Sequence, residues 1–508
     1  MKQADLIRML TPIAPTMGEL KADFYWFFVP NRLVWDAFKK FWGENDTAPW
    51  IQNVEYEIPQ IVAPENGWTK GSLADYMGYP TKIGGYKASA LPFRAYALIW
   101  NEWFRDQNLK NPCYITKGDS DITGIDILDA NYDYVTDTEK AAAPCKAAKY
   151  FDYFTSCLPQ AQKGPAVTVP LGDTAPLLFK SLPDQMQASD FPQAGKQVGI
   201  HQSTTPRFTY PTDAIEFDNA TSTSYINDGE AQLVADLSLA VGATVNQLRQ
   251  AFQIQKFYER QAIGGTRYIE MVKSHFEVTN PDFRMQRPEY LGGKRIPINM
   301  NQVVQTDATK EYSIYDDTES SWVTKDGTPQ GNTAAYSVTS DVDNDMFTHS
   351  FTEHGILMGL AVVRTIHTYQ QGLNRQWSKK KFTDFYFPEF ANLGNMAVLN
   401  KEIFLQGTDE DEEAFGYQEA WASERYFPNR VSGGMRSNFD QPLDIWHYAD
   451  DYESLPALSS EWIDETKDNV ARTLAVQNHD QFFGDFYFGA IYTRPMPLYS
   501  VPGLIDHH

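Results

Sequence analysis

Between Phe24 and Trp42 the chain reads FYWFFVPNRLVWDAFKKFW, with nine aromatic rings in nineteen residues. Side chains alternate between the two faces of a strand, and a strand with one face in water alternates apolar and polar residues. From Phe24 to Val29 every side chain is apolar or aromatic, so both faces of this strand must be covered. We predict a second sheet on one face and, on the other, an inserted layer of the same chain or another subunit.

The pattern changes directly after this strand. Asn31 is a candidate N-cap, and Val34, Phe38 and Phe41 then recur at helical spacing until Gly43. We therefore predict a helix that begins at Asn31 and packs its aromatic face against the rest of the fold.

Short β-like runs recur along the rest of the chain, separated by clusters of Pro, Gly, Asn and Asp. This arrangement favours a mainly β, antiparallel sandwich over an α/β fold. The clearest further strands are predicted over Gly355 to Tyr369 and Phe486 to Thr493. Segments 160–230 and 301–350 are polar and have little periodicity, so we predict long surface loops there, which usually carry function or contacts.

Two longer helices are also predicted. Thr244 and Gln247 form a capping box, and one face of the segment Val245 to Ile263 is apolar until Gly264 ends it. A second amphipathic helix is predicted around Ala97 to Gln107. The chain should therefore contain a few helices among many strands.

The 508-residue chain carries 43 basic and 66 acidic residues, a formal net charge of −23. Such a surface favours solubility and repels nucleic acid on average, although a local basic patch is compatible with it. Cys113, Cys145 and Cys157 form no close pair in the sequence, so we predict neither a disulfide framework nor a zinc site. MKQADLIRML is too polar for a secretory signal, and the apolar run 355–363 is too short for a membrane span. We expect a soluble protein without membrane insertion.

Signatures of catalysis are missing from the sequence. It contains no GxGxxG, P-loop, GxSxG or HExxH motif, so we predict a protein that is not an enzyme, with no catalytic residues and no cofactor. A carbohydrate-binding or carbohydrate-processing β-sandwich is the alternative, because the chain is acidic and rich in aromatic residues. No positive motif supports that alternative.

Three segments resemble metal sites, but each lacks a needed feature. His349 and His354 are five residues apart, so they do not share a face of a helix or of a strand. The segment Asp341 to Asp345 starts like a calcium loop but has Met346 where a glycine is needed. The acidic run 409–413 is typical of a solvated loop. We predict no metal site.

One basic segment, RQWSKKKF from Arg375 to Phe382, interleaves cations with aromatic rings. Single-stranded nucleic acid is bound by backbone charge together with base stacking on such rings. A solvated turn whose lysines lay their apolar stems on the surface is the competing interpretation. The residues predicted to face DNA are Arg375, Trp377, Lys379, Lys380 and Lys381.

The C-terminal segment TRPMPLYSVPGLIDHH is apolar but contains three prolines, which lack a backbone donor and do not fit the middle of a sheet. We predict an extended tail over about 493–508, which packs on its own sandwich or crosses onto a neighbouring subunit. The candidate inter-subunit residues are Pro495, Pro497, Leu498, Pro502 and Leu504.

Long stretches of the sequence resemble the major capsid proteins of Microviridae, especially of gokushovirus-like single-stranded DNA phages. The similar stretches occur in the family's order and cover nearly the whole chain. They are ADFYWFFVPNRLVWDAFKKFWGE and the segments 247–268, 280–293, 327–336, 351–377, 387–395, 415–437, 443–449 and 493–507.

The resemblance implies a viral jelly roll, an eight-stranded antiparallel β-sandwich with long inserted loops, as a single domain over 1–508. It implies sixty copies in a T=1 icosahedral shell around a circular single-stranded DNA genome, and thus a location in the virion after assembly in the host bacterial cytoplasm. The segment of about 163–230 corresponds to a variable surface insertion that builds a protrusion at the three-fold axis. Family members also carry an N-terminal arm, and the comparison suggests that this chain begins near the end of the first strand.

Partners are implied in the same way. Besides identical subunits and the DNA, they are a small basic DNA-binding protein, internal scaffolding and DNA pilot proteins, and a host cell-surface receptor, for which a glycan is one candidate. The small basic protein would neutralise the genome, which agrees with the acidic charge of this chain.

Overall fold

The computed structural model describes residues 1–44, 56–128, 131–167, 245–298, 301–316, 321–331, 333–337, 339–343, 345–477 and 479–494, and four short strands between 177 and 235. Contacts divide the chain into two compact units. The first consists of Met1–Ala161 and Ala262–His508, and the second of Gln162–Gln261. The residues of the predicted C-terminal tail from Pro495 onward, and most of the segment 163–230, lie outside the described residues.

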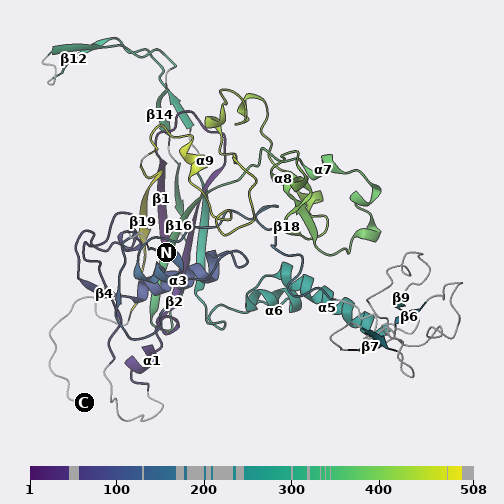
Figure 1. The fold of residues 1–508 in the computed structure, drawn as a ribbon. Helices are drawn as coiled ribbons and strands as arrows, with labels where there is room; N and C mark the ends of the chain where they lie inside the picture. The colour runs from purple at the N-terminus through teal and green to yellow at the C-terminus, as the bar shows by residue number, and fades with distance from the viewer. Residues whose placement is uncertain are drawn as a thin grey trace, which may run out of the picture. The chain divides into compact units, whose positions relative to one another are not determined.

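Two three-stranded antiparallel sheets form the centre of the first unit (Figure 1). One has the strand order β15-β1-β19 and the other the order β10-β2-β16. Their strands are β1 (Lys2–Met9), β2 (Leu20–Pro30), β10 (Glu289–Pro297), β15 (Thr339–Asp343), β16 (Gly355–Thr365) and β19 (Phe482–Gly489).

Aromatic rings of β2 pack directly against the other sheet. Phe24 contacts Phe486 edge to face, with 5.4 Å between ring centroids, and Trp26 contacts Phe488 at 5.3 Å. The indole of Trp26 also donates a 2.8 Å hydrogen bond to Gln3 in β1. The predicted second sheet on this face of the aromatic strand is confirmed.

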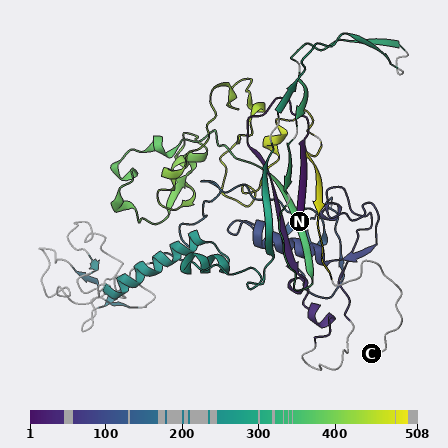
Figure 2. The same ribbon diagram turned by 180° about the vertical axis from the view of Figure 1, so that it is seen from behind.

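A helical layer of the same chain covers the opposite face of β2 (Figures 1 and 2). It consists of α3 (Leu91–Ile99), which continues as one wide π-type turn, η2 (Trp100–Phe104). Phe27 is 1% exposed and contacts the rings of Trp103 and Phe104 at 5.4 and 5.9 Å. The second apolar face is therefore sealed by an inserted layer, one of the two alternatives.

The N-terminal residues form a strand, β1 (Lys2–Met9), that precedes β2 in the chain. β1 is the central strand of its sheet and pairs with β19 along Lys2–Met9 and with β15 from Gln3 to Ile7. Its inward side chains include Gln3 and Asp5, which are 1% and 3% exposed. These buried polar residues disrupt the apolar alternation by which a strand is recognised.

The predicted helix after Pro30 is only partly present. The chain forms a 3-10 turn, η1 (Asn31–Leu33), and then one short turn of helix, α1 (Phe38–Phe41). Asn31 accepts backbone hydrogen bonds through its carbonyl, and its side chain makes no capping contact. Val34 and Phe38 are buried nevertheless, so the apolar spacing identified a core segment correctly but not a continuous helix.

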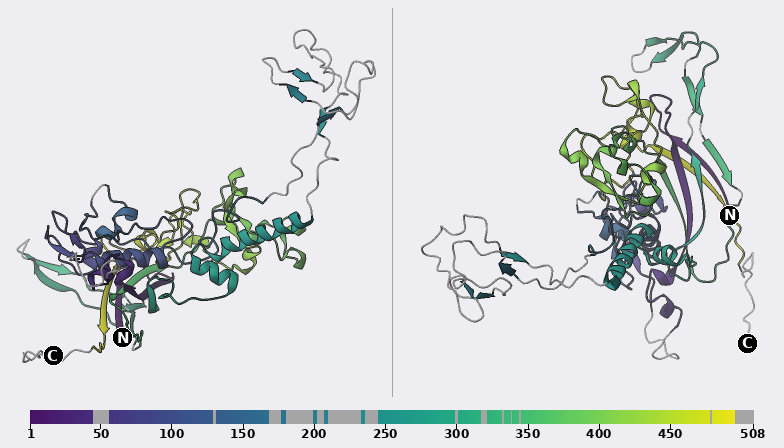
Figure 3. Two further views of the ribbon diagram at one scale, coloured as in Figure 1. Left: turned by 90° about the horizontal axis from the view of Figure 1, so that it is seen from below. Right: turned by 90° about the vertical axis from the view of Figure 1, so that its right-hand side faces the viewer.

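The other predicted strands are present, but their ends differ from the predicted ones. β16 begins at Gly355, as predicted, and ends at Thr365, while β19 begins at Phe482, earlier than predicted. Helix α5 (Val245–Gly264) matches its prediction and is seen as one continuous teal helix in Figure 3, although Thr244 of its expected capping box lies outside the described residues. Helix α3 begins at Leu91, before the predicted Ala97.

Segment 301–350 is not the loop that its polarity suggested. It contains two antiparallel ribbons and ends in β15 beside β1. β13 is exposed along nearly its whole length, so neither face needs apolar residues and no alternation marks the strand. The ribbons pair β11 (Asn301–Val304) with β14 (Thr333–Ser337) and β12 (Tyr312–Asp316) with β13 (Ser321–Lys325).

The remaining elements are short. The further helices are α2 (Leu73–Tyr76), α4 (Tyr134–Asp137), α6 (Tyr268–Phe276), α7 (Arg375–Ser378), α8 (Asn400–Ile403) and α9 (Asp468–Ala471). The further strands are β3 (Gln60–Val62), β4 (Lys87–Ser89), β5 (Ile122–Thr123), β6 (Leu177–Phe179), β7 (Gly199–His201), β8 (Arg207–Thr209), β9 (Leu233–Ala235), β17 (Met396–Leu399) and β18 (Ala414–Gln418). Among the described helices, none combines the length and the apolar character that crossing a bilayer requires.

The three cysteines are free, as expected, but two of them meet in the fold. The Sγ atoms of Cys113 and Cys145 lie 3.8 Å apart, and the hydroxyl of Thr138 is 3.2 Å from Cys145. The fold therefore brings together two thiols that are 32 residues apart in the sequence.

A buried charged cluster joins the three strands of the β2 sheet. Asp23 in β2 accepts hydrogen bonds from Arg295 in β10 at 2.6 Å and from Arg364 in β16 at 2.5 Å. Tyr150 donates to the same carboxylate at 2.8 Å, and both guanidinium groups lie over its ring. Burial by itself raises the pKa of Asp23, but the hydrogen bonds from Arg295, Tyr150 and Arg364 outweigh it and lower that pKa below its usual value.

A second buried cluster holds a histidine between two carboxylates. In His367, Nδ1 lies 2.8 Å from Asp450 and Nε2 lies 3.0 Å from Glu465. Asn469 also donates to Asp450 at 3.0 Å. Burial alone lowers the pKa of His367, but the two hydrogen bonds to carboxylates raise it to about 9. His367 is therefore a doubly protonated cation at neutral pH.

We expect the stability of the subunit to fall between about pH 6.5 and pH 9 because of His367. Its folded pKa, about 9, exceeds the ordinary value of 6.5, so its stabilising contribution is complete below pH 6.5 and is lost as the pH rises through 9. Urea unfolding of the unassembled subunit across this range measures the effect. His367→Gln should flatten the profile, whereas the matched change at exposed His479 should leave it as in the wild type. An unchanged slope in His367→Gln contradicts the assignment.

Candidate nucleic-acid interface

The basic segment predicted to face DNA lies on and after the single-turn helix α7. Asn374 caps this helix, accepting a 2.9 Å hydrogen bond from the backbone N–H of Gln376. Trp377 is 69% exposed, and the side chains of Lys380 and Lys381 are also exposed. Three of the five predicted residues are therefore available to a ligand.

The other two cations neutralise carboxylates of the same chain. Arg375 donates to Glu402 at 3.1 Å and to the carbonyl of Ala397 at 2.8 Å. Lys379 forms a 2.5 Å ion pair with Glu424, and only 6% of its side chain is exposed. Both contacts position α7 against the elements below it, so these residues build the site and do not themselves face outward.

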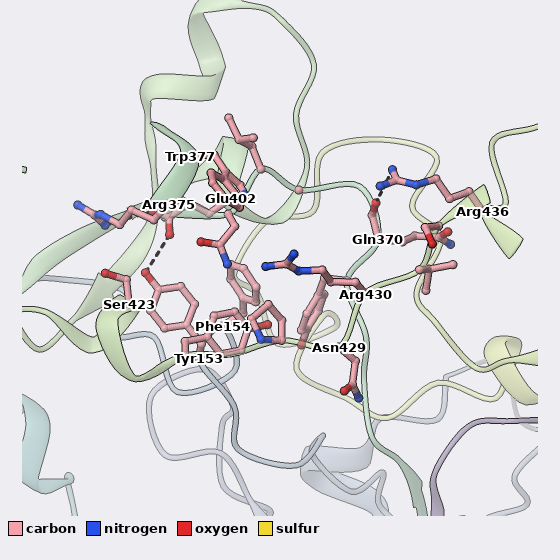
Figure 4. A pocket seen from close by; sticks show the side chains of 18 residues that line it. Tyr153, Phe154, Gln370, Arg375, Trp377, Glu402, Ser423, Asn429, Arg430 and Arg436 are labelled. Carbon is pink, nitrogen blue, oxygen red and sulfur yellow. Dashed lines mark hydrogen bonds and ion pairs between the residues drawn. The ribbon is translucent and has the colours of Figure 1, made fainter. Parts of the chain in front are cut away.

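Beside α7 lies a cavity of about 320 Å³, shown with its lining side chains in Figure 4. Its aromatic wall consists of rings that pack against one another. The rings of Tyr153 and Tyr426 stack nearly in parallel with 4.7 Å between centroids, and Phe154 meets Tyr426 edge to face at 5.8 Å. Trp377 lines the cavity as well.

The cavity carries arginines that the sequence analysis did not single out. Arg430 and Arg436 line it, and Figure 4 shows the guanidinium of Arg430 in the middle of the labelled side chains. Arg436 donates a 3.3 Å hydrogen bond to the carbonyl of Gln370, whereas Arg430 forms no hydrogen bond or ion pair within the described part of the chain. These residues lie far from Arg375 in sequence, and Arg430 belongs to a segment rich in Asn, Ser and Gly, 429–434.

Glu402 is the only acidic side chain among the described residues that line the cavity. It is 6% exposed and is already satisfied by Arg375 and by the hydroxyl of Tyr153, which donates at 2.9 Å. Burial raises the pKa of Glu402, although Arg375 counters the rise. The charge left for a ligand is therefore positive and comes from Arg430 and Arg436.

The segments that resembled metal sites are used otherwise. His349 lies 3.4 Å from Glu289, and His354 stacks on the ring of Trp42 with 4.6 Å between centroids. Asp341 accepts an ion pair from Lys294 at 3.0 Å. The described residues contain no cluster of three or more histidine, cysteine or acidic side chains suited to a metal ion.

Comparison with known protein families decides the class of this chain. The model of the phage capsid protein family described as "Capsid protein (F protein)" matches residues 1–504. The chain belongs to this capsid protein family. The resemblance found in the sequence is thereby confirmed.

Individual relatives agree with the family match. The chain is 42% identical to capsid protein VP1 of Spiroplasma virus 4, 40% identical to capsid protein VP1 of Bdellovibrio phage phiMH2K and 35% identical to capsid protein VP1 of Chlamydia phage 1. Each comparison covers 99% of this chain and 89–90% of the relative.

Membership in the family establishes a structural role. This capsid protein is a component of a phage particle and assembles with identical subunits into a shell. The described architecture, with many small antiparallel sheets and few helices, agrees with the expected β-rich capsid subunit.

Proposed function

We propose that this capsid protein folds as a viral jelly roll and that sixty copies form a T=1 icosahedral shell around a circular single-stranded DNA genome. The observation that carries the proposal is the pair of facing antiparallel sheets in a chain whose residues 1–504 match the phage capsid family. Closed symmetry lets moderately stable contacts, repeated around each axis, add up to a stable shell. The role is structural, and no catalytic step is part of it.

A separate protein is needed to neutralise the negative charge of the genome. With a formal net charge of −23, the subunit does not neutralise DNA, so a separate small basic protein would do so. Scaffolding and DNA pilot proteins would act during assembly in the host bacterial cytoplasm, and the insertion at about 163–230 would contact a host receptor at the three-fold axis. That the segment Gln162–Gln261 forms a compact unit of its own supports its role as an inserted module.

Imaging tests the shell directly. The purified chain, produced together with the other proteins of its phage, should yield uniform icosahedral particles in negative-stain electron microscopy, with sixty subunits by native mass measurement. Nuclease-resistant single-stranded DNA should be recovered from them. A protein that remains a monomer under all assembly conditions contradicts the shell, and saturable glycan binding by such a monomer favours the carbohydrate-binding alternative.

The C-terminal tail should act between subunits. Truncation from Thr493 onward, which removes Pro495, Pro497, Leu498, Pro502 and Leu504, is expected to leave a folded subunit that assembles poorly, because this apolar segment would lose its contact with water against a neighbouring subunit. Circular dichroism reports on the fold and particle yield on assembly. Wild-type particle yield from the truncated chain would refute this role.

A further inference from the structure

We propose that the cavity between α7 and the turn at Arg430 binds one nucleotide of the packaged single-stranded DNA, with its base against the aromatic wall and its phosphate on arginine. The inference rests on the proposed genome-enclosing function and names the site where a base would be received. It moves the predicted DNA contact away from Arg375 and Lys379, because these two cations are engaged by Glu402 and Glu424.

The size and shape of the cavity suit a ligand of this class. A volume of about 320 Å³ lies at the small end of the range for specific ligand sites. The stacked rings of Tyr153 and Tyr426 are fixed by neighbours and by the hydrogen bond from Tyr153 to Glu402, so the aromatic wall is pre-formed. A flat ring gains stacking contact on such a wall without an ordering cost, and this gain is similar for every base.

The positive charge of the cavity favours an anionic ligand. The chain has a net charge of −23, yet this site presents Arg436 together with Arg430, which has no hydrogen-bond or ion-pair partner among the described residues. Guanidinium groups bind phosphate oxygens with two parallel hydrogen bonds. A neutral sugar would make no use of this surplus charge, and the one carboxylate that could accept its hydroxyl groups, Glu402, is already occupied.

Polar side chains at the rim of the cavity can form hydrogen bonds with the edge of a base. Asn429 is exposed, lines the cavity and forms no hydrogen bond within the described residues, so its amide is free to donate and accept. Trp377, 69% exposed on the opposite segment, can cover the base from its other face. Because stacking and phosphate contacts dominate, we expect binding with little sequence preference.

The test measures binding of a fluorescent eight-nucleotide oligo(dT) to the unassembled full-length subunit by anisotropy. We expect Arg430→Gln and Trp377→Ala each to weaken binding by about five-fold or more. Arg430→Gln should also reduce the dependence of log K on log salt by about one phosphate contact, a change that a merely structural role would not produce. Trp377→Phe should retain most of the affinity. Thymidine 5′-phosphate should compete for the site better than deoxyribose 5-phosphate, which lacks the base.

Arg425→Gln is the matched control, because Arg425 is an exposed arginine of the same segment that pairs with Glu419 and does not line the cavity. Equal oligo(dT) binding by wild type, Arg430→Gln and Trp377→Ala overturns the inference, and so does saturable glucose binding at this cavity in place of nucleotide binding. These variants should still assemble. If particles with packaged DNA form but the cavity does not bind oligo(dT), the nucleotide site is excluded and the proposed function stands. If the wild type forms no shell, the proposed function itself is wrong.

Discussion

Asp23→Ala should lower the free energy of unfolding of the unassembled subunit by about 3–5 kcal/mol, the range found when one partner of a buried ion pair is removed. Arg364 has 12% of its side chain exposed, so without Asp23 its charge stays buried without its counter-ion. Tyr150 loses its acceptor at the same time. The loss should be large because three strands and the Tyr150 loop meet at this one carboxylate.

Urea unfolding at neutral pH gives the measurement, and the surface pair of Lys39 and Glu44 gives the control. These two side chains are 61% and 52% exposed, so Glu44→Ala should change the stability by less than about 1 kcal/mol. The pKa of Asp23 is lowered in the folded state, so the wild type should lose this contribution as the pH falls below the ordinary value near 3.8. If Asp23→Ala and Glu44→Ala behave alike, the cluster does not stabilise the sheet.

Phe27→Ala should have an effect of similar size for a different reason. Removal of a fully buried phenylalanine costs about 3–5 kcal/mol, because the transfer energy of the ring is lost and a cavity remains. Phe27 is 1% exposed and touches Trp103, Phe104 and Tyr290, so the helical layer would lose these ring contacts with β2. Thermal unfolding of the unassembled subunit should show a large decrease in Tm.

Phe427→Ala is the matched control for this experiment. Its ring is 89% exposed, and surface substitutions usually change stability by no more than about 0.5 kcal/mol. A Phe27→Ala subunit as stable as Phe427→Ala would show that the helical layer of α3 and η2 does not stabilise this face of β2. Particle yield should follow the stability of the subunit, since unfolded chains do not enter the shell.

Much of the architecture could be predicted from local pattern. The aromatic strand, β16, β19 and α5 could be recognised because apolar residues recur in each at the spacing of its secondary structure. β1 and β13 were missed for opposite reasons: β1 carries buried polar residues that are satisfied across the sheets, and β13 has almost no buried face. Apolar periodicity indicates which face of an element can be buried. It does not indicate which strands are hydrogen-bonded to each other.

The candidate site was found only in part. Trp377 and its lysines could be recognised because cations and aromatic rings lie together in one short segment. Tyr153, Tyr426 and Arg430 come from other segments, and nothing in the sequence indicates that they converge. The sequence likewise gave no indication that Arg375 and Lys379 are neutralised, since their partners, Glu402 and Glu424, lie well downstream.

The residues alone thus determined that the chain needs cover on both faces of one aromatic strand, and that it resembles a phage capsid protein. Both conclusions depend on local composition and on stretches that stay recognisable in order. Tertiary structure alone decided what provides the cover, which charges neutralise one another and which arginines line a cavity together with stacked rings. The physical reason is that electrostatic and stacking contacts depend on distance in space, which the order of residues does not specify for segments far apart in the chain.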